Sequence, residues 1–197
     1  MNFSPAAERN KAPILQALQG LLPARADVLE IASGTGQHAE HCAAAQAGWT
    51  WQPTERDAAA LPSIDARCQA LGNVLPARQL DVTTTPWPVE QASVDALYCA
   101  NLLHIAPWSV CPALMRGAAL HLRPTGLLLL YGPYRVDGEA TAPSNDAFGI
   151  DLRSRDPAWG LRLLSEVEHE ARAAGLALQQ TLPMPANNLL LVFACSR

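Results

Sequence analysis

The feature that most constrains the fold of this chain is a repeated alternation of strand-like and helix-like segments. Short apolar runs are followed by longer segments whose apolar residues recur at helical spacing. Strands separated by helices form a mostly parallel sheet that is covered on both faces. The sequence therefore predicts an α/β fold. The expected strands are 27–32, 49–52, 74–80, 94–99, 126–131, 176–181 and 189–195.

The expected helices are placed from apolar spacing and capping residues. Ser4-Pro5 is typical of a helix start, and a second start is expected at Asn10, with Pro13 in its first turn. Residues 1–25 should therefore form an N-terminal helical segment. The other expected helices end near Gly48, cover 61–71, run to about Leu120 and cover 161–174.

One polar segment breaks this alternation. It reaches from Tyr131 to Trp159 and is rich in Pro, Asp, Arg and Ser. Loops of this length in a compact domain usually carry function. We expect residues 133–160 to be a mobile insertion that closes over a substrate, within a single domain of residues 1–197.

Composition limits the kinds of partner. Hydrophobic residues make up 49% and charged residues 16% of the chain, which is enough apolar material for a globular core. The net charge of -4 argues against nucleic acid, because affinity for a phosphate backbone comes from concentrated Lys and Arg. No apolar run could span a bilayer, and the cysteines form no C-x-x-C pair. We expect no membrane partner and a cytoplasmic location, and the sequence is compatible with a homodimer.

A glycine-rich turn follows the first expected strand, in the sequence Glu30-Ile31-Ala32-Ser33-Gly34-Thr35-Gly36-Gln37-His38. Open parallel sheets bind ligands at the carboxyl ends of their strands, where glycines let the backbone approach the ligand. Residues 34–39 also fit the dinucleotide pattern G-x-G-x-x-[GA], so a nicotinamide or flavin enzyme is an alternative. Glu30 would repel a pyrophosphate and attract a sulfonium, which favours S-adenosylmethionine. The residues expected to bind it here are Glu30, Ser33, Gly34 and Gly36.

Two further acids follow later strands. Glu55 lies about twenty residues beyond the glycines, the separation at which an acid binds ribose hydroxyls. Asp81 and Val82 follow the third expected strand, where a carboxylate can accept from an adenine amino group. The alternative is that each acid caps a loop or faces water. Since three acids follow three successive strands, we expect Glu55, Asp81 and Val82 to bind the cofactor.

The oxidoreductase alternative lacks its catalytic pair. A short-chain dehydrogenase uses Tyr-x-x-x-Lys to lower the pKa of the tyrosine, and the single lysine, Lys11, has no tyrosine beside it. A non-catalytic sensor that binds the cofactor remains an alternative, because no residue of the turn requires a substrate.

The fourth expected strand runs into Asn101-Leu102-Leu103-His104-Ile105-Ala106-Pro107-Trp108, which should face the methyl group. The segment lacks the Asn/Asp-Pro-Pro-Tyr/Phe pattern that stacks an extruded base. Asn101 can hold a substrate atom or the cofactor, and His104 is the candidate general base or substrate-orienting group. The alternative for His104 is a packing histidine with a satisfied ring nitrogen.

The polar insertion and its flanks supply aromatic and basic side chains. These would suit a small planar or anionic substrate closed over by the loop. The alternative is that Arg153 and Arg155 pair with Asp151 and Asp156 and hold the loop shut. The expected catalytic residues are His104, Asn101 and Tyr134, and the expected substrate-binding residues are Tyr131, Arg153, Arg155 and Trp159.

Several stretches resemble the methyltransferase-like proteins of domain-of-unknown-function family 938. The matching stretches are 4–11, 33–38, 51–53, 101–108, 131–134, 152–157 and 184–189. The resemblance implies the Rossmann-like class I methyltransferase fold, with a seven-stranded mostly parallel sheet, an antiparallel last strand and S-adenosylmethionine over Gly34 and Gly36. The resemblance also draws attention to Arg9 and Asn10 as residues that could reach the cofactor. The sequence departs from the class I pattern at Ala32, where a glycine is usual.

These expectations combine into one functional prediction. The chain should be an S-adenosylmethionine-dependent methyltransferase that acts on the oxygen or nitrogen of a small metabolite, with no metal. In-line transfer from an activated carbon depends mainly on holding the nucleophile and the methyl group in line, so a general base is optional.

Overall fold

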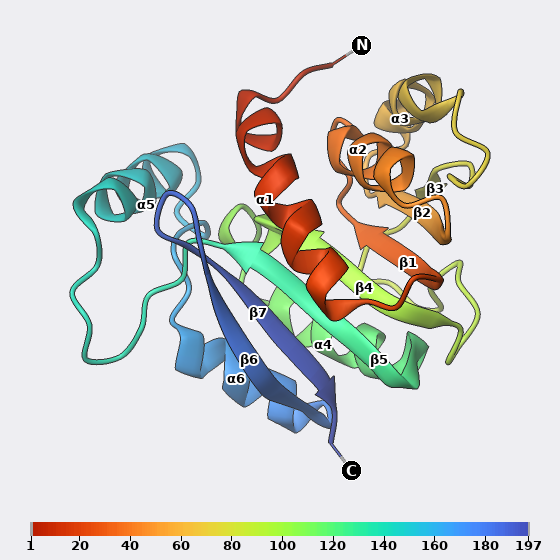
Figure 1. Cartoon of the computed structure of the whole chain (residues 1–197). Coiled ribbons are helices and arrows are strands. Elements are labelled where there is room, and N and C mark those ends of the chain that lie inside the picture. Colours follow the sequence, from red (N-terminus) through yellow and green to blue (C-terminus); the bar gives the residue numbers. More distant parts are fainter. Residues whose placement is uncertain (1, 197) are drawn as a thin grey trace.

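The computed structural model describes residues 2–196 and contains a seven-stranded sheet in the order β3-β2-β1-β4-β5-β7-β6 (Figure 1). Strand β7 runs antiparallel to both of its neighbours, and the other pairings are parallel. This confirms the predicted sheet with an antiparallel last strand. The strands are β1 (Ala26–Ile31), β2 (Trp49–Glu55), β3 (Arg78–Gln79), β4 (Val94–Ala100), β5 (Leu122–Gly132), β6 (Leu176–Met184) and β7 (Asn188–Cys195).

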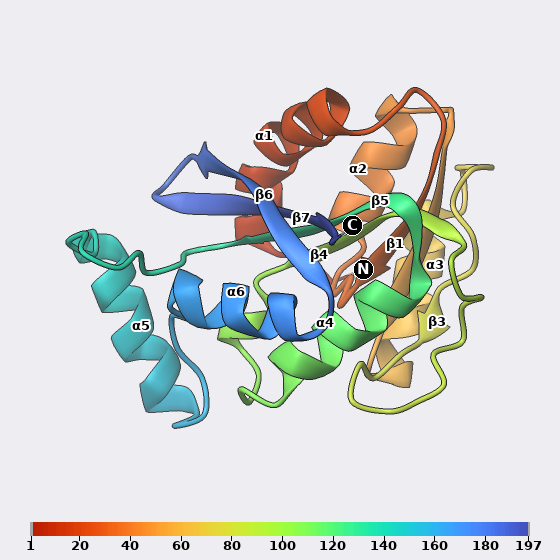
Figure 2. The ribbon, with the colours of Figure 1, turned by 90° about the horizontal axis from the view of Figure 1, so that it is seen from below.

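Helices cover both faces of the sheet (Figure 2). Helices α1, α2 and α3 lie on one face, and α4 and α6 lie on the other, while α5 lies beyond the carboxyl end of β5 (Figure 1). The helices are α1 (Pro5–Leu21), α2 (Gln37–Ala45), α3 (Leu61–Cys68), α4 (Val110–His121), α5 (Pro143–Arg155) and α6 (Leu164–Ala173), with short 3-10 turns η1 (Ala58–Ala60) and η2 (Leu102–His104).

Each face of the sheet has its own apolar core. In β5, Leu128 and Leu130 face α4 and α6, whereas Leu129 faces α1 and α2. Successive side chains of a strand point to opposite faces, so a leucine run serves both cores at once. Trp49 and Trp51 stack on the α1 and α2 side with ring centroids 6.3 Å apart. This agrees with the expected sheet that is covered on both faces.

The N-terminal helix is continuous, so the expected second start at Asn10 is wrong. Ser4 caps α1, because its Oγ accepts from the Ala7 amide at 3.2 Å, and Pro13 lies inside the helix. The Asn10 side chain does not cap a helix. It contacts His38 of α2 instead.

Two other expected elements differ from the structure. The strand expected at 74–80 is reduced to Arg78–Gln79 plus a single bridge between Trp51 and Val74, because Pro76 has no N–H to continue the ladder. The segment from Tyr131 to Trp159 is not a continuous loop, because it contains α5. The sequence of α5 has no clear apolar stripe, which is why helical spacing did not indicate it.

The parallel strands β1, β2, β4 and β5 end at one edge of the sheet, the carboxyl edge. The glycine-rich turn, Glu55, Asn101 and Gly132 all lie there. Among residues 2–196, no helix is long and apolar enough to cross a membrane. Within the same residues, no three or more His, Cys, Asp or Glu side chains are arranged to hold a metal ion.

Candidate functional site

The glycine-rich turn leaves β1 through three residues with positive φ. Ala32, Gly34 and Gly36 have φ values of 57°, 56° and 73°. A left-handed alanine costs on the order of 1 kcal/mol or more and is seen mainly where function or packing imposes it. Ala32 therefore adopts the left-handed backbone conformation that glycine favours, although the sequence has alanine at this position.

Gly34 and Gly36 differ in the space around their Cα atoms. A Cβ on Gly34 would meet no atom within 4 Å, so the turn is open to a ligand at this residue. A Cβ on Gly36 would lie 3.2 Å from Cγ2 of Ile64 on α3. Gly34 is thus the residue over which a cofactor has room, and Gly36 is needed for the packing of α3 against the turn.

The end of β2 is tied to the same turn. The Ser33 amide donates to the Thr54 carbonyl at 2.8 Å, and the Thr54 amide donates to Ser33 Oγ at 3.2 Å. The Gly34 amide donates to Glu55 Oε2 at 2.9 Å. Glu55 Oε1 also accepts from the Arg56 amide at 2.8 Å and the Asp57 amide at 3.5 Å. A carboxylate oxygen has about two acceptor positions, so Oε2 retains one for a hydroxyl of a ligand above Gly34.

Asp81 and Val82 lie in the segment that follows β3. Asp81 Oδ1 accepts from the amide and the hydroxyl of Thr83, and these bonds lower the pKa of the carboxyl. Both bonds are made by Oδ1, so this oxygen caps the loop, as the alternative for Asp81 expected. Val82 is buried against the α4 core. Binding of an adenine ring by this pair stays a prediction.

Asn101 follows β4 and has a φ of 61°. Its amide donates to the Tyr131 carbonyl at 2.8 Å, which joins the ends of β4 and β5. Its Oδ1 lies beside Gly132, 3.5 Å from where a Cβ would be. The structure therefore brings Asn101 to the carboxyl edge together with Gly34 and Glu55.

Glu30 is a buried carboxyl and not an exposed charge at the turn. Its side chain is 2% exposed beneath α1 and α2, and its Oε2 accepts from the Trp51 indole at 2.8 Å. Burial raises the pKa of Glu30 to about 7. The Trp51 indole bonds to the carboxyl, which limits the rise. Direct contact of Glu30 with a cofactor stays a prediction.

His104 lies in η2, directly after β4, and is 1% exposed. Its ring meets Tyr134 edge-on, with centroids 4.8 Å apart, and a Cβ on Gly132 would lie 2.3 Å from its Nε2. Within the described residues, neither ring nitrogen has a hydrogen-bond partner. Burial lowers the pKa of His104 to about 3, so the ring is neutral. A neutral, unpaired ring fits hydrogen bonding to a substrate better than holding a proton.

The two tyrosines after Leu130 lie in different cores. Tyr131 faces α1, and burial raises its pKa. Tyr134 packs in the α4 and α6 core beside His104. The expected roles of Tyr134 in catalysis and of Tyr131 in substrate binding stay predictions.

The three insertion residues expected to bind substrate lie at the end of α5 and just after it. The Arg155 guanidinium stacks 5.2 Å from the Trp159 ring centroid, and its Nη1 is 3.9 Å from Asp151 Oδ2. The Arg153 guanidinium lies next to Gly160, 3.4 Å from where a Cβ would be. Arg155 therefore pairs with Asp151, as expected in the alternative in which the arginines hold the loop shut. Their binding of a substrate stays untested.

Gln37 and Arg67, which sequence reasoning missed, hold the N-terminal segment over the glycine-rich turn. Gln37 Oε1 accepts from the Ser4 amide and Nε2 donates to Glu8, at 2.6 Å and 3.0 Å. Arg67 donates to the Thr35 carbonyl at 2.8 Å and to the Asn2 carbonyl at 2.7 Å. Arg9, in contrast, is exposed. No sequence pattern marks an arginine on α3 as a partner of residue 2.

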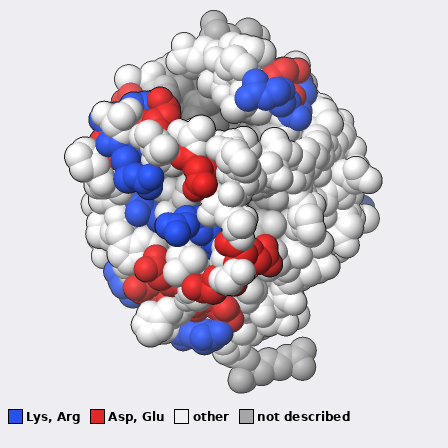
Figure 3. Space-filling model, turned by 90° about the vertical axis from the view of Figure 1, so that its left-hand side faces the viewer, with Lys and Arg blue, Asp and Glu red and all other residues white. Residues whose placement is uncertain are grey.

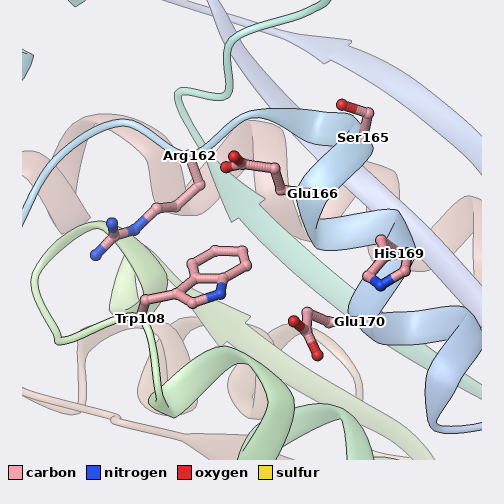
Figure 4. Close-up of a pocket in the computed structure, with 6 residues that line it drawn as sticks. All are labelled: Trp108, Arg162, Ser165, Glu166, His169 and Glu170. Carbon is pink, nitrogen blue, oxygen red and sulfur yellow. The ribbon is translucent and has the colours of Figure 1, made fainter.

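A separate cavity of about 390 Å³ lies between Trp108 and α6 (Figure 4). Its wall includes Arg162, which stacks on Trp108 and donates to the Leu103 and Ala106 carbonyls. Arg162 thus braces the segment that carries His104. None of the residues expected to form the site lines this cavity.

Comparisons with known proteins agree with this architecture. The sequence model of a family described as "Protein of unknown function (DUF938)" matches residues 1–195. The mitomycin 7-O-methyltransferase MmcR matches with a TM-score of 0.81 and 17% identity, over 97% of this chain and 54% of that chain. CalO1, a methyltransferase in calicheamicin biosynthesis solved in an SAH-bound form, matches with a TM-score of 0.76 and 17% identity, over 94% of this chain and 54% of that chain.

The chain spans about half the length of those two proteins. The YcgJ protein from Bacillus subtilis matches over 96% of this chain and 99% of that chain, with a TM-score of 0.72 and 17% identity. At these identities the likeness establishes the fold, which is the predicted class I methyltransferase arrangement.

Proposed function

The chain belongs to the DUF938 family and has the class I methyltransferase fold, and we propose that it is an S-adenosylmethionine-dependent methyltransferase of a small molecule. The observation that carries the proposal is the open turn at Gly34, with the Glu55 carboxylate fixed against its amide at 2.9 Å. Such a turn offers a backbone surface and an acid for ribose hydroxyls at one strand edge.

The residues present fit the cofactor. Gly34 leaves room for its amino-acid portion, Glu55 would hold its ribose, and Asp81 with Val82 would hold its adenine. S-adenosylmethionine, when bound, supplies an activated methyl group. The protein would then contribute position, because holding two groups in line removes much of the entropic barrier.

His104 would act on the substrate at the end of β4. Its neutral ring, free of partners in the described part of the chain, can accept a hydrogen bond from a substrate hydroxyl or amine. The tight approach of Gly132 to Nε2 means that a substrate reaches this nitrogen only after the neighbouring segment shifts. This supports the idea that residues 133–160 move on binding.

A small substrate is supported by the surface charge. On the face that carries α5, basic and acidic side chains are interspersed and form no continuous basic surface (Figure 3). Together with the net charge of -4, this favours a small planar or anionic molecule over nucleic acid. Oxygen and nitrogen acceptors are both compatible with a hydrogen-bonding His104.

Cofactor binding is tested by calorimetry with S-adenosylmethionine, S-adenosylhomocysteine and NAD. We expect 1:1 binding of the first two with dissociation constants in the micromolar range, about -8 kcal/mol. Gly34→Leu should abolish binding. Gly175→Leu is the matched control, because Gly175 also has positive φ and open surroundings but lies between α6 and β6. Tighter binding of NAD, or equal loss in both variants, would refute the proposal.

Activity is tested by incubating the protein and labelled S-adenosylmethionine with a metabolite extract, followed by mass spectrometry of labelled products. His104→Ala should reduce turnover roughly tenfold if His104 orients the substrate through one hydrogen bond, and only slightly if it is a packing histidine. Label found only in protein or RNA would contradict the small-molecule substrate. Tight cofactor binding with no labelled product would favour the sensor.

A further inference from the structure

His38 is buried beside the glycine-rich turn and has no role in the site described above. It is the second residue of α2 and is 8% exposed. Its Nε2 lies 2.8 Å from Asn10 Oδ1 on α1, and its Nδ1 lies 3.3 Å from the Tyr98 hydroxyl on β4. One ring therefore joins α1, α2 and the sheet.

The protonation of this ring follows from its partners. Asn10 Oδ1 only accepts hydrogen bonds, so Nε2 carries the proton, and Nδ1 accepts from the Tyr98 hydroxyl. Glu30 Oε1 is 3.9 Å from Nδ1, which is too far for a hydrogen bond. Burial lowers the pKa of His38 to about 4, so the ring is neutral and can serve as donor and acceptor at once.

The position of the first half of α1 depends on such polar contacts. The buried residues of α1 are Ile14 and Leu18, both in its second half. The first half, 5–11, is tied to α2 through Ser4 and Glu8 on Gln37, and through Asn10 on His38. All three bonds are partly buried, and the Gln37 and His38 side chains are 3% and 8% exposed.

We propose that His38 is a positioning residue that fixes the first half of α1 over the glycine-rich turn and thereby shapes the cofactor site. The inference rests on the proposed function. His38 acts through Asn10, and Asn10 in turn lies beside the Tyr131 hydroxyl at the end of β5. If the bond breaks, the first half of α1 keeps its bonds to Gln37 but loses the one to His38, and the wall of the site moves.

Two amide substitutions separate the ring nitrogens. In His38→Gln the amide nitrogen reaches the position of Nε2 and can still donate to Asn10, whereas in His38→Asn the shorter amide reaches only the position of Nδ1. His41→Asn on the same helix is the matched control, because the His41 Nε2 has no partner within residues 2–196. Asn10→Ala removes the other partner without touching the buried ring.

The measurements are hydrogen exchange of residues 5–12 in the cofactor-free protein and the dissociation constant of S-adenosylhomocysteine. His38→Asn and Asn10→Ala should each speed exchange about tenfold and weaken binding about tenfold, as expected for the loss of a partly buried hydrogen bond. His38→Gln and His41→Asn should behave like the wild type.

Equal behaviour of His38→Gln and His38→Asn in both measurements would overturn the proposal. So would faster exchange in His38→Asn and Asn10→Ala without weaker binding. If His38→Asn does not fold, the exchange of residues 5–12 in Asn10→Ala decides in its place, because Asn10 is itself expected to reach the cofactor and its removal would weaken binding directly. A wild-type protein that fails to bind S-adenosylhomocysteine would refute the proposed function, while the exchange of residues 5–12 would still show whether His38 holds α1.

Discussion

Glu30→Gln should stabilise the protein at and above neutral pH. Glu30 is 2% exposed, and burial raises the pKa of its carboxyl from an ordinary value of 4.5 to about 7. The neighbouring His38 is neutral and does not offset a negative charge. Glutamine has nearly the same volume and keeps an oxygen that can accept from the Trp51 indole, now at 2.8 Å. The substitution therefore removes the buried charge and keeps the hydrogen bond.

The size and sign of the effect follow from the two pKa values. Because the folded value is above the unfolded one, the folded state keeps a proton that the unfolded state releases between pH 4.5 and 7. The free energy of unfolding of the wild type therefore falls as pH rises through this window. The difference corresponds to roughly 3 kcal/mol, or about 6–12 °C in melting temperature for a chain of this size.

The assay is urea denaturation of wild type and variant from pH 4.5 to pH 8. The free energies of unfolding of the two proteins should be nearly equal at pH 4.5. As pH rises to about 7.5, the wild type should lose stability, so the advantage of the variant over the wild type should grow steadily. Glu90→Gln, at an exposed position, is the control and should change stability by less than about 0.5 kcal/mol. A difference that does not depend on pH, or a variant that is less stable at pH 8, would refute the assignment of a buried carboxyl with a raised pKa.

Three further substitutions test the packing of the site. His104→Leu should raise the free energy of unfolding by about 1–2 kcal/mol at pH 7, because it removes a buried ring whose nitrogens lack partners. The stability advantage of this variant over the wild type should grow as pH falls from 6.5 towards 3, because unfolded wild type then binds a proton that the buried ring of folded His104 does not take up. Urea titrations at pH 7 and pH 5 check both points. Gly36→Ala should lower the melting temperature, because its Cβ would press on Ile64 at 3.2 Å, and an unchanged melting curve would contradict the packing role. Gly117→Ala should cost roughly 1–3 kcal/mol, since its Cβ would lie 1.9 Å from Trp87; calorimetry showing no loss would mean that the indole moves freely.

Local sequence patterns determined the sheet and the place of the site. Leu127–Leu130 could be read as a strand buried on both faces, because a parallel sheet covered by helices needs apolar residues at every position. The run from Glu30 to His38 located the turn, because positive φ favours glycine there. The same reasoning failed for 74–80, where apolar residues suggested a longer strand than Pro76 allows, and for α5, which has no apolar stripe.

Only the tertiary structure decided what the side chains around the turn do. Glu30 and Glu55 both follow strands as acids, yet one is buried against Trp51 and the other bonds to the Gly34 amide. The register puts both acids on the same face, because Glu30 pairs with Pro53, two residues before Glu55. Glu30 is covered by neighbouring elements, whereas Glu55 is the last residue of β2 and lies at the carboxyl edge, a difference that sequence spacing does not fix. His38 and Asn10 are 28 residues apart, and only the packing of α1 on α2 brings them within 2.8 Å. The burial that sets the pKa of Glu30, His38 and His104 comes from those long-range contacts, because desolvation depends on what covers a group and not on its neighbours in the chain.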